Sequence, residues 1–169
     1  MAPAAAAKNL AERPSLTLTR RLRARPEKVY AAWTDPLNLA QWFGPTTAKP
    51  GTMQAELDAR VGGRYRIRWE NTDGEYFEVG GVYREVVPNA RLQFTWAWHS
   101  TPERESLVTI DIKPEASGTL MIFNHAQFAD ETARDNHARG WSEFFDETAR
   151  DNHQRGWNSF FDKLDAFVA

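Results

Sequence analysis

The chain has 169 residues, of which 41% are hydrophobic and 26% charged, and its formal net charge is −2 at pH 7. This length and composition are typical of one globular domain. The small net charge argues against bulk electrostatic binding to nucleic acid or to an anionic membrane, and no run of about 18 apolar residues predicts a membrane-spanning helix. Cysteine is absent, which excludes disulfides and thiol chemistry, so we expect a reducing, cytoplasmic location.

The N-terminal stretch MAPAAAAKNLAERP consists mostly of small and polar residues. It lacks a long apolar run behind a charged start, which a signal peptide would need. We therefore expect residues 1–14 to form a disordered leader. Residues 15–169 are then expected to form a single domain.

Apolar and polar residues alternate over residues 16–22, which predicts a strand with one buried face. Two short helices are expected next. Pro26 with Glu27 is typical of a helix start, and Asp35–Pro36 ends the first helix and begins the second. Gly44–Pro45 is expected to stop the second helix.

From there to about residue 125 the pattern predicts five or six consecutive antiparallel strands. Apolar side chains recur at every second position in RYRIRW, LQFTWAW and TLMIFNH, and Pro88–Asn89 and Pro114–Gly118 are turn signals. The glycine pairs at 62–63 and 80–81 are expected at bulges or close backbone approaches.

Residues 130–168 have the periodicity of an amphipathic helix, with an apolar stripe that includes Trp157, Phe160 and Leu164. A sheet with one apolar face must be covered by another layer. The sequence therefore predicts an α+β fold in which a curved antiparallel sheet wraps around a long C-terminal helix, with two short helices after the first strand.

Residues 130–145 and 146–161 form a tandem repeat: DETARDNHARGWSEFF is followed by DETARDNHQRGWNSFF, and three positions differ. Because 16 residues turn a straight helix by about 160° beyond whole turns, the two apolar stripes would point in nearly opposite directions. Only the second copy is followed by Leu164, Phe167 and Val168. We therefore expect the second copy to fill the groove of the sheet.

The first copy then needs other cover for Trp141, Phe144 and Phe145. A bend could fold this segment back as a helical hairpin. Alternatively, the exposed aromatic stripe could meet a second molecule, which predicts a homodimer.

Five sequence blocks, in order, carry a family resemblance: LTRRLRARPEKVYAAWTDPLNLAQWFGP, GGRYRIRW, GGVYREVVPNARLQFTWAW, GTLMIFNHAQF and HQRGWNSFFDKLDAFV. Together they resemble the activator-of-heat-shock-protein-90-ATPase homologues of the START-like (SRPBCC) superfamily. The resemblance implies a helix-grip, Bet v-like fold with a hydrophobic cavity between the sheet and the C-terminal helix. It does not imply one activity, because relatives include polyketide cyclases, lipid carriers and co-chaperone domains.

Seven Trp and ten Phe residues suggest an aromatic-lined cavity, although core packing is the alternative for each of them. We expect a hydrophobic or aromatic small molecule as ligand, and neither a cofactor nor a metal. The candidate ligand-binding residues are Trp33, Trp42, Phe43, Tyr65, Trp69, Phe94, Trp96, Trp98, His125, Trp157 and Phe160.

His125 is a weak candidate for catalysis, because period-two alternation places it on one face with Met121 and Phe123. The alternative is a histidine bonded to nearby backbone. An enzyme of the cyclase or hydrolase type therefore stays a minority hypothesis. A protein-interaction module related to heat-shock protein 90 co-chaperone domains is the other alternative.

His137 and His153 each lie two residues after an aspartate. Two residues are the wrong spacing for joint metal binding on one helix, so we interpret both histidines as exposed helix surface. Arg64, Arg66 and Arg68 share one strand face, and we expect them to pair with glutamates of neighbouring strands on a solvated surface.

Overall fold

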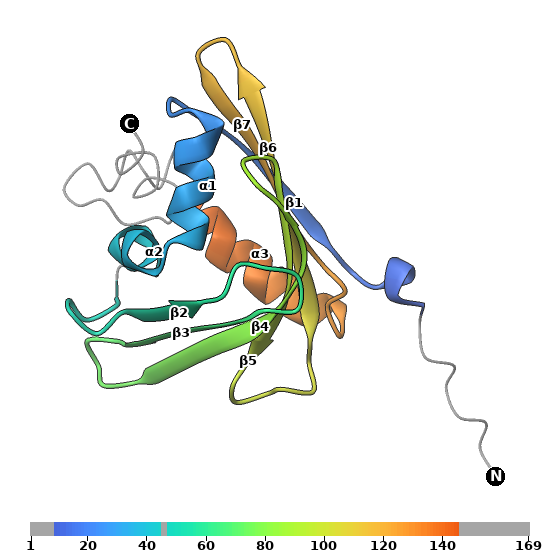
Figure 1. The fold of residues 1–169 in the computed structure, drawn as a ribbon. Helices are drawn as coiled ribbons and strands as arrows, with labels where there is room; N and C mark the ends of the chain where they lie inside the picture. Colours follow the sequence, from blue (N-terminus) through green and yellow to red (C-terminus); the bar gives the residue numbers. More distant parts are fainter. Residues whose placement is uncertain (1–8, 45–46, 146–169) are drawn as a thin grey trace.

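The computed structural model describes residues 9–44 and 47–145 (Figure 1). Within them, seven strands form one antiparallel sheet and three α-helices lie against it. The helices are α1 (Pro26–Thr34), α2 (Pro36–Trp42) and α3 (Glu131–Phe145). The strands are β1 (Leu16–Leu22), β2 (Gln54–Leu57), β3 (Arg64–Glu70), β4 (Tyr76–Val87), β5 (Arg91–Trp98), β6 (Ser106–Glu115) and β7 (Gly118–Ala126). A short 3-10 helix, Leu10–Glu12, precedes β1.

The strand order is β1-β7-β6-β5-β4-β3-β2, so consecutive strands from β2 to β7 are neighbours. Only β1 is out of sequence order, pairing with β7 from Leu16↔His125 to Leu22↔Thr119. This topology confirms the predicted meander of six strands after the helices. The predicted alternation of buried side chains is also observed in β3, where every second residue from Tyr65 is buried: Tyr65, Ile67 and Trp69.

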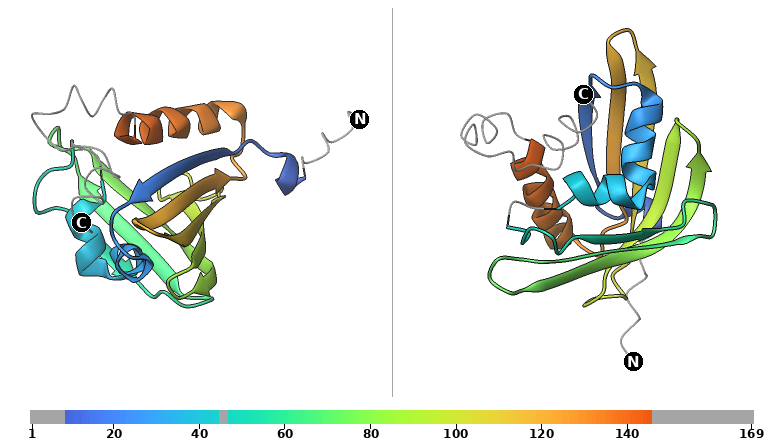
Figure 2. Two further views of the ribbon diagram at one scale, coloured as in Figure 1. Left: turned by 90° about the horizontal axis from the view of Figure 1, so that it is seen from above. Right: turned by 60° about the vertical axis from the view of Figure 1, so that its left-hand side comes forward.

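The sheet curves sharply, and the three helices lie on its concave side (Figures 1 and 2). Two features of β4 accompany the curvature. Its register with β5 shifts between Tyr83 and Glu85, which marks an irregularity of the bulge type. A Cβ on Gly81 would overlap the Thr95 carbonyl oxygen of β5, and a Cβ on Gly80 would lie 2.7 Å from the Tyr65 oxygen of β3. The predicted close backbone approach at residues 80–81 is therefore confirmed.

Asp35 separates α1 from α2 and caps the second helix. Its Oδ1 accepts hydrogen bonds from the backbone N–H groups of Leu37 (2.9 Å) and Asn38 (3.1 Å). The capping satisfies two of the donors that a helix start leaves unpaired. The indole of Trp42 then donates to the Ala32 carbonyl at 2.9 Å, which locks α2 against α1.

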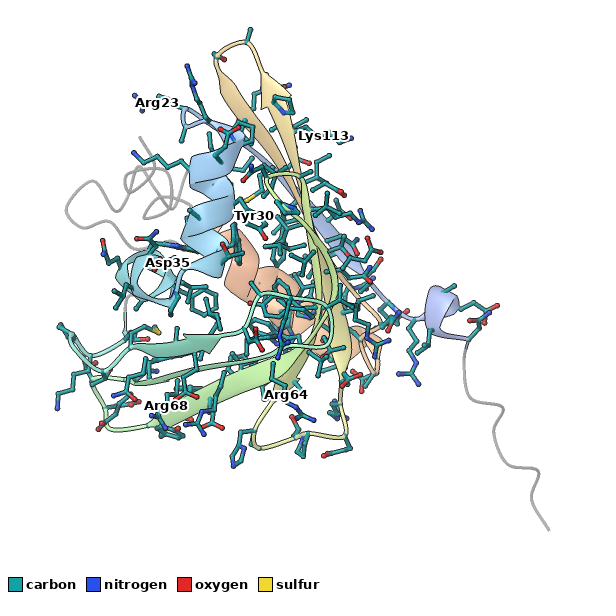
Figure 3. All side chains as sticks on the ribbon, viewed as in Figure 1. Arg23, Tyr30, Asp35, Arg64, Arg68 and Lys113 are labelled. Carbon is teal, nitrogen blue, oxygen red and sulfur yellow. The ribbon has the colours of Figure 1, made fainter. Side chains whose placement is uncertain are left out.

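The convex face of the sheet carries the polar side chains. Figure 3 shows Arg64 and Arg68 on the side of β3 opposite to α1 and α2. Arg66 forms the expected cross-strand ion pair, with Glu56 of β2 at 3.6 Å. Arg68 instead donates to Gln54 at 2.7 Å. The paired-arginine prediction is therefore right for Arg66, and for Arg68 the hydrogen bond goes to an amide.

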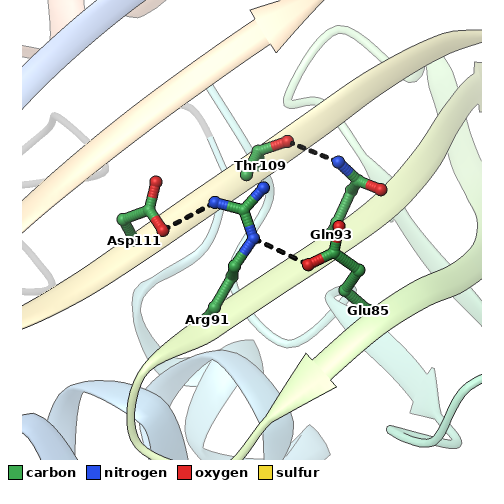
Figure 4. A network of polar contacts seen from close by, with 5 residues as sticks. All are labelled: Glu85, Arg91, Gln93, Thr109 and Asp111. Carbon is green, nitrogen blue, oxygen red and sulfur yellow. Dashed lines mark hydrogen bonds and ion pairs between the residues drawn. The ribbon is translucent and has the colours of Figure 1, made fainter.

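A second polar network ties three strands together on the same face (Figure 4). Arg91 of β5 donates to Glu85 of β4 at 2.8 Å and to Asp111 of β6 at 2.7 Å. Beside it, Gln93 donates to Thr109 at 3.1 Å. The guanidinium thus bridges carboxylates on both neighbouring strands.

The first copy of the repeat supplies α3, whose start is capped by Asp130: its Oδ1 accepts from the Ala133 N–H at 2.7 Å. The predicted sheet wrapped around C-terminal helical structure is confirmed for α3. The second copy and the tail to residue 169 lie outside the described residues, so the expectation that the second copy fills the groove stays a prediction. Of the predicted leader, residues 9–14 are described and include the 3-10 helix.

Candidate functional site

A small cavity lies between α1–α2 and the concave face of the sheet. Its volume is about 10 Å³, close to the space of one water molecule. Six of its nine lining side chains are aromatic, and they come from the helices and from the sheet. The lining residues are Trp33, Leu39, Phe43, Leu57, Tyr65, Ile67, Tyr83, Phe94 and Trp96.

Ring-on-ring packing forms one end of this cavity. Tyr65, Tyr83 and Phe94 contact one another with centroid separations of 5.1 to 5.9 Å. The Tyr65 hydroxyl donates to the Thr95 carbonyl at 2.6 Å, so its polar end is satisfied within the sheet. Burial, with smaller effects of Tyr83 and Glu105, raises the pKa of Tyr65 well above its usual value. Burial also raises the pKa of Tyr83. Both tyrosines are therefore neutral and present apolar ring surface.

Trp33 forms the opposite wall from α1. Its ring meets Trp42 edge-on at 4.8 Å and stacks on Phe123 at 6.4 Å. The Trp33 Nε1 atom is buried and has no hydrogen-bond partner among residues 9–44 and 47–145. A buried indole N–H without an acceptor is costly, by about 1–3 kcal/mol.

The sequence-predicted ligand residues divide into three groups. Trp33, Phe43, Tyr65, Phe94 and Trp96 line the cavity. The others in the described region, which do not line it, are Trp42, Trp69, Trp98 and His125. Trp157 and Phe160 lie outside the described residues.

Four lining residues were not predicted from the sequence. Leu39, Ile67 and Tyr83 are buried, and Leu57 is half-buried. Ile67 was identifiable, because it alternates with Tyr65 and Trp69 on the apolar face of β3. Leu57 lies on a strand of only four residues, too short to produce a clear period-two signal.

A polar cluster lies where α3 meets the sheet, and it adjoins the cavity, because the ring of the lining residue Trp96 lies 5.6 Å from that of His125. His125 of β7 is 0% exposed, and its Nε2 lies 2.7 Å from the Ser106 Oγ of β6. Ser106 also donates to the Trp96 carbonyl at 3.2 Å. The ring of His125 packs against Phe128 at 4.3 Å. The ring of His125 is thus held by the side chain of Ser106.

His137 of α3 completes this cluster. Trp98 Nε1 donates to His137 Nε2 at 3.2 Å, and His137 Nδ1 lies 2.8 Å from the Ala133 carbonyl oxygen. An indole N–H can only donate and a carbonyl can only accept, so His137 is neutral with its proton on Nδ1. The sequence interpretation of His137 as exposed surface is therefore wrong, because the residue is half-buried against Trp98 of β5 and His125 of β7.

Both histidines are neutral in this environment. Burial, with a smaller effect of His137, lowers the pKa of His125 well below its usual value. Burial also lowers the pKa of His137, and the hydrogen bond to Ala133 opposes the shift. The cluster is consequently uncharged at neutral pH, which suits a structural contact inside an aromatic core.

Within residues 9–44 and 47–145, no group of three or more His, Asp or Glu side chains converges on one point. The ring of His125 is closed off from solvent. In the same part of the chain, no helix is long and apolar enough to cross a membrane.

Comparison with known proteins agrees with this architecture. A crystal structure of a Chromobacterium violaceum protein is 28% identical, covers 91% of this chain and 96% of its own, and has a TM-score of 0.72. The AHSA1 protein of Silicibacter pomeroyi is also 28% identical, over 85% of this chain and 100% of that chain, with a TM-score of 0.65. An AHSA1-like protein of Aeromonas hydrophila (23% identity, 86% and 96% coverage, TM-score 0.63) shares the fold.

No curated protein gives a significant match to this chain. The family model described as "Activator of Hsp90 ATPase homolog 1-like protein" matches residues 23–169. This match spans most of the sequence, and the curved seven-stranded sheet with its helices agrees with it. The chain belongs to the activator of Hsp90 ATPase homolog 1-like family and has the helix-grip fold of its structural relatives.

Proposed function

We propose that this protein binds an apolar small molecule in the cavity between α1–α2 and the sheet. The observation that carries the proposal is the composition of the wall, in which aromatic rings from two layers surround one space. Aromatic walls with few polar groups are typical of sites for apolar ligands. The helix-grip fold supports the same function, because the cavity lies beneath helices on the concave face.

The present volume sets a condition on binding. About 10 Å³ cannot hold an organic molecule, so side chains of the wall must move when a ligand enters. Leu57 is half-buried, whereas the other eight lining residues are buried. It lies on β2, a four-residue edge strand that pairs with β3. We therefore expect the cavity to open beside Leu57.

Trp33 adds an expectation about ligand chemistry. Its buried N–H has no acceptor among the described residues. A hydroxyl or carbonyl oxygen on a bound ligand would supply one. We therefore expect an apolar body with a single acceptor oxygen to bind more tightly than a hydrocarbon of equal length.

Titration with n-alkanols from hexanol to decanol tests this function, with tryptophan fluorescence and thermal stability as readouts. Burial of each added methylene should tighten binding about fourfold. Leu57→Ala should widen the opening and tighten binding further. The matched control is Leu37→Ala, because Leu37 on α2 is 77% exposed and does not line the cavity. Absence of saturable binding in both the unchanged protein and Leu57→Ala would contradict the proposal.

A further inference from the structure

The contact between α3 and the sheet depends on residues that the chain carries twice. We call Trp98, His125 and Phe128 the histidine socket, because they surround the ring of His137. We propose that this socket binds either copy of the repeat: His137 as in the structure, or His153 of the same chain in its place. The C-terminal segment would then have two alternative registers on one sheet.

The histidine socket has three chemical requirements for the residue that it binds. It needs a neutral imidazole whose Nε2 accepts from the Trp98 indole. The ring must also fit at about the observed centroid distances, 5.2 Å from His125 and 4.9 Å from Phe128. Finally, a helical carbonyl four residues earlier holds the proton on Nδ1, as that of Ala133 does.

The amino-acid sequence of the second copy provides the same residues for these requirements. His153 is preceded by Ala149 at the same four-residue distance, and Asp146 stands where Asp130 caps the first copy. The three positions that differ between the copies are 138, 142 and 143 in the first. None of them takes part in the socket contacts given above. The socket contacts therefore do not discriminate between the two copies.

Both copies cannot dock at once within one straight helix, since 16 residues rotate the second stripe by about 160°. The first copy is favoured by its short link, residues 127–130 between β7 and α3. Lengthening that link by 16 residues costs about tenfold in population through loop closure. The second copy has an opposing advantage, because Leu164, Phe167 and Val168 follow it as additional apolar surface. These effects oppose each other, which is the condition for two populated registers.

Exchange within one chain is favoured over exchange between chains. When the second copy is bound, residues 127–145 serve as the link between β7 and that copy. A link of this length holds His153 at an effective concentration near the millimolar range. Free protein at micromolar concentration cannot compete with that. The two registers should therefore interconvert in a way that does not depend on protein concentration.

Indole N–H signals in NMR spectra of tryptophan-labelled full-length protein test the proposal, with Trp98 assigned through Trp98→Phe. In His137→Ala, the Trp98 signal should stay near its original position, because His153 takes over the bond. In the double variant His137→Ala/His153→Ala, it should move to the position of an unbonded indole. The matched control is His99→Ala, an exposed histidine next to Trp98, whose removal should leave the bond intact.

Two results would overturn the exchange. One is a Trp98 signal that moves as far in His137→Ala as in the double variant. The second concerns His153→Ala, a variant that leaves the described contacts untouched. The spectrum of the unchanged chain should contain a minor Trp98 signal from the register in which His153 is bound, and His153→Ala should remove that signal. If that spectrum is unaltered by His153→Ala, or if the minor signal grows with protein concentration, the intrachain register is excluded.

Discussion

Trp98 and His137, 39 residues apart in the chain, join β5 to α3 through a hydrogen bond of 3.2 Å between indole Nε1 and imidazole Nε2. The bond fixes the tautomer of His137, and it is a direct polar link between the sheet and the C-terminal helix. Trp98 lies at the end of β5, and its ring packs edge-on against Trp96 with centroids 5.6 Å apart. The bond to His137 therefore links α3 to this aromatic pair.

Replacing Trp98 with Phe should destabilise the protein by about 1 kcal/mol, because His137 Nε2 loses its donor while a ring of similar shape remains. Urea denaturation measures the change. His99→Phe is the comparison, since the His99 side chain is 77% exposed and its loss should cost little. Equal stability of Trp98→Phe and the unchanged protein would show that the indole bond contributes nothing to the docking of α3.

Stability should depend on pH between 7.5 and 5. The folded-state pKa values of His125 and His137 are both lowered, so the unfolded chain binds more protons below its pKa of about 6.5. The free energy of unfolding is therefore full above that pH and falls as pH decreases, by up to about 1.4 kcal/mol per pH unit for each histidine. His125→Gln should reduce the slope by about half. Stability that is flat or rises toward pH 5 would contradict neutral, buried histidines.

Ser106→Ala should destabilise the fold by about 1–3 kcal/mol, because the buried His125 Nε2 loses its 2.7 Å partner. Ser117→Ala, in the exposed turn between β6 and β7, serves as the matched serine control. The midpoint of denaturation is the readout. Indistinguishable midpoints for the two variants would mean that the Ser106 contact is replaced at no cost.

Arg91→Leu on the convex face should cost about 0.5–1 kcal/mol and leave Glu85 and Asp111 without their shared cation. The three side chains are 31% to 45% exposed, so the loss should shrink as salt concentration rises. Arg21→Leu is the control: its 3.2 Å pair with Glu115 involves an arginine that is 75% exposed and should contribute less. A larger effect from Arg21 than from Arg91 would contradict this ranking.

Much of the fold was predictable from local pattern. Period-two alternation placed Leu92, Phe94 and Trp96 on one face of β5, and the Asp35–Pro36 pair separated the two helices as expected. These features depend on neighbours in sequence, so the sequence displays them directly. The family resemblance was confirmed for the same reason, since its blocks follow the strands and helices in order.

The candidate site was less predictable because it depends on distant contacts. His137 looked exposed in a polar segment, and its contacts with Trp98 and His125 across the fold make it half-buried. Trp42 and Phe43 are adjacent aromatics, yet only Phe43 lines the cavity, whereas Trp42 packs between the helices. Aromatic identity therefore predicts burial well but does not predict which side of the core faces an open space.

Nuclear Overhauser contacts from a bound n-decanol chain give the most direct test of the proposed cavity. The protons of the alkyl chain should show contacts with ring protons of Trp33, Phe43 and Phe94, which face the cavity from two layers. Contacts confined to exposed side chains such as Tyr76, 56% exposed on β4, would place the molecule on the surface and contradict an internal apolar site.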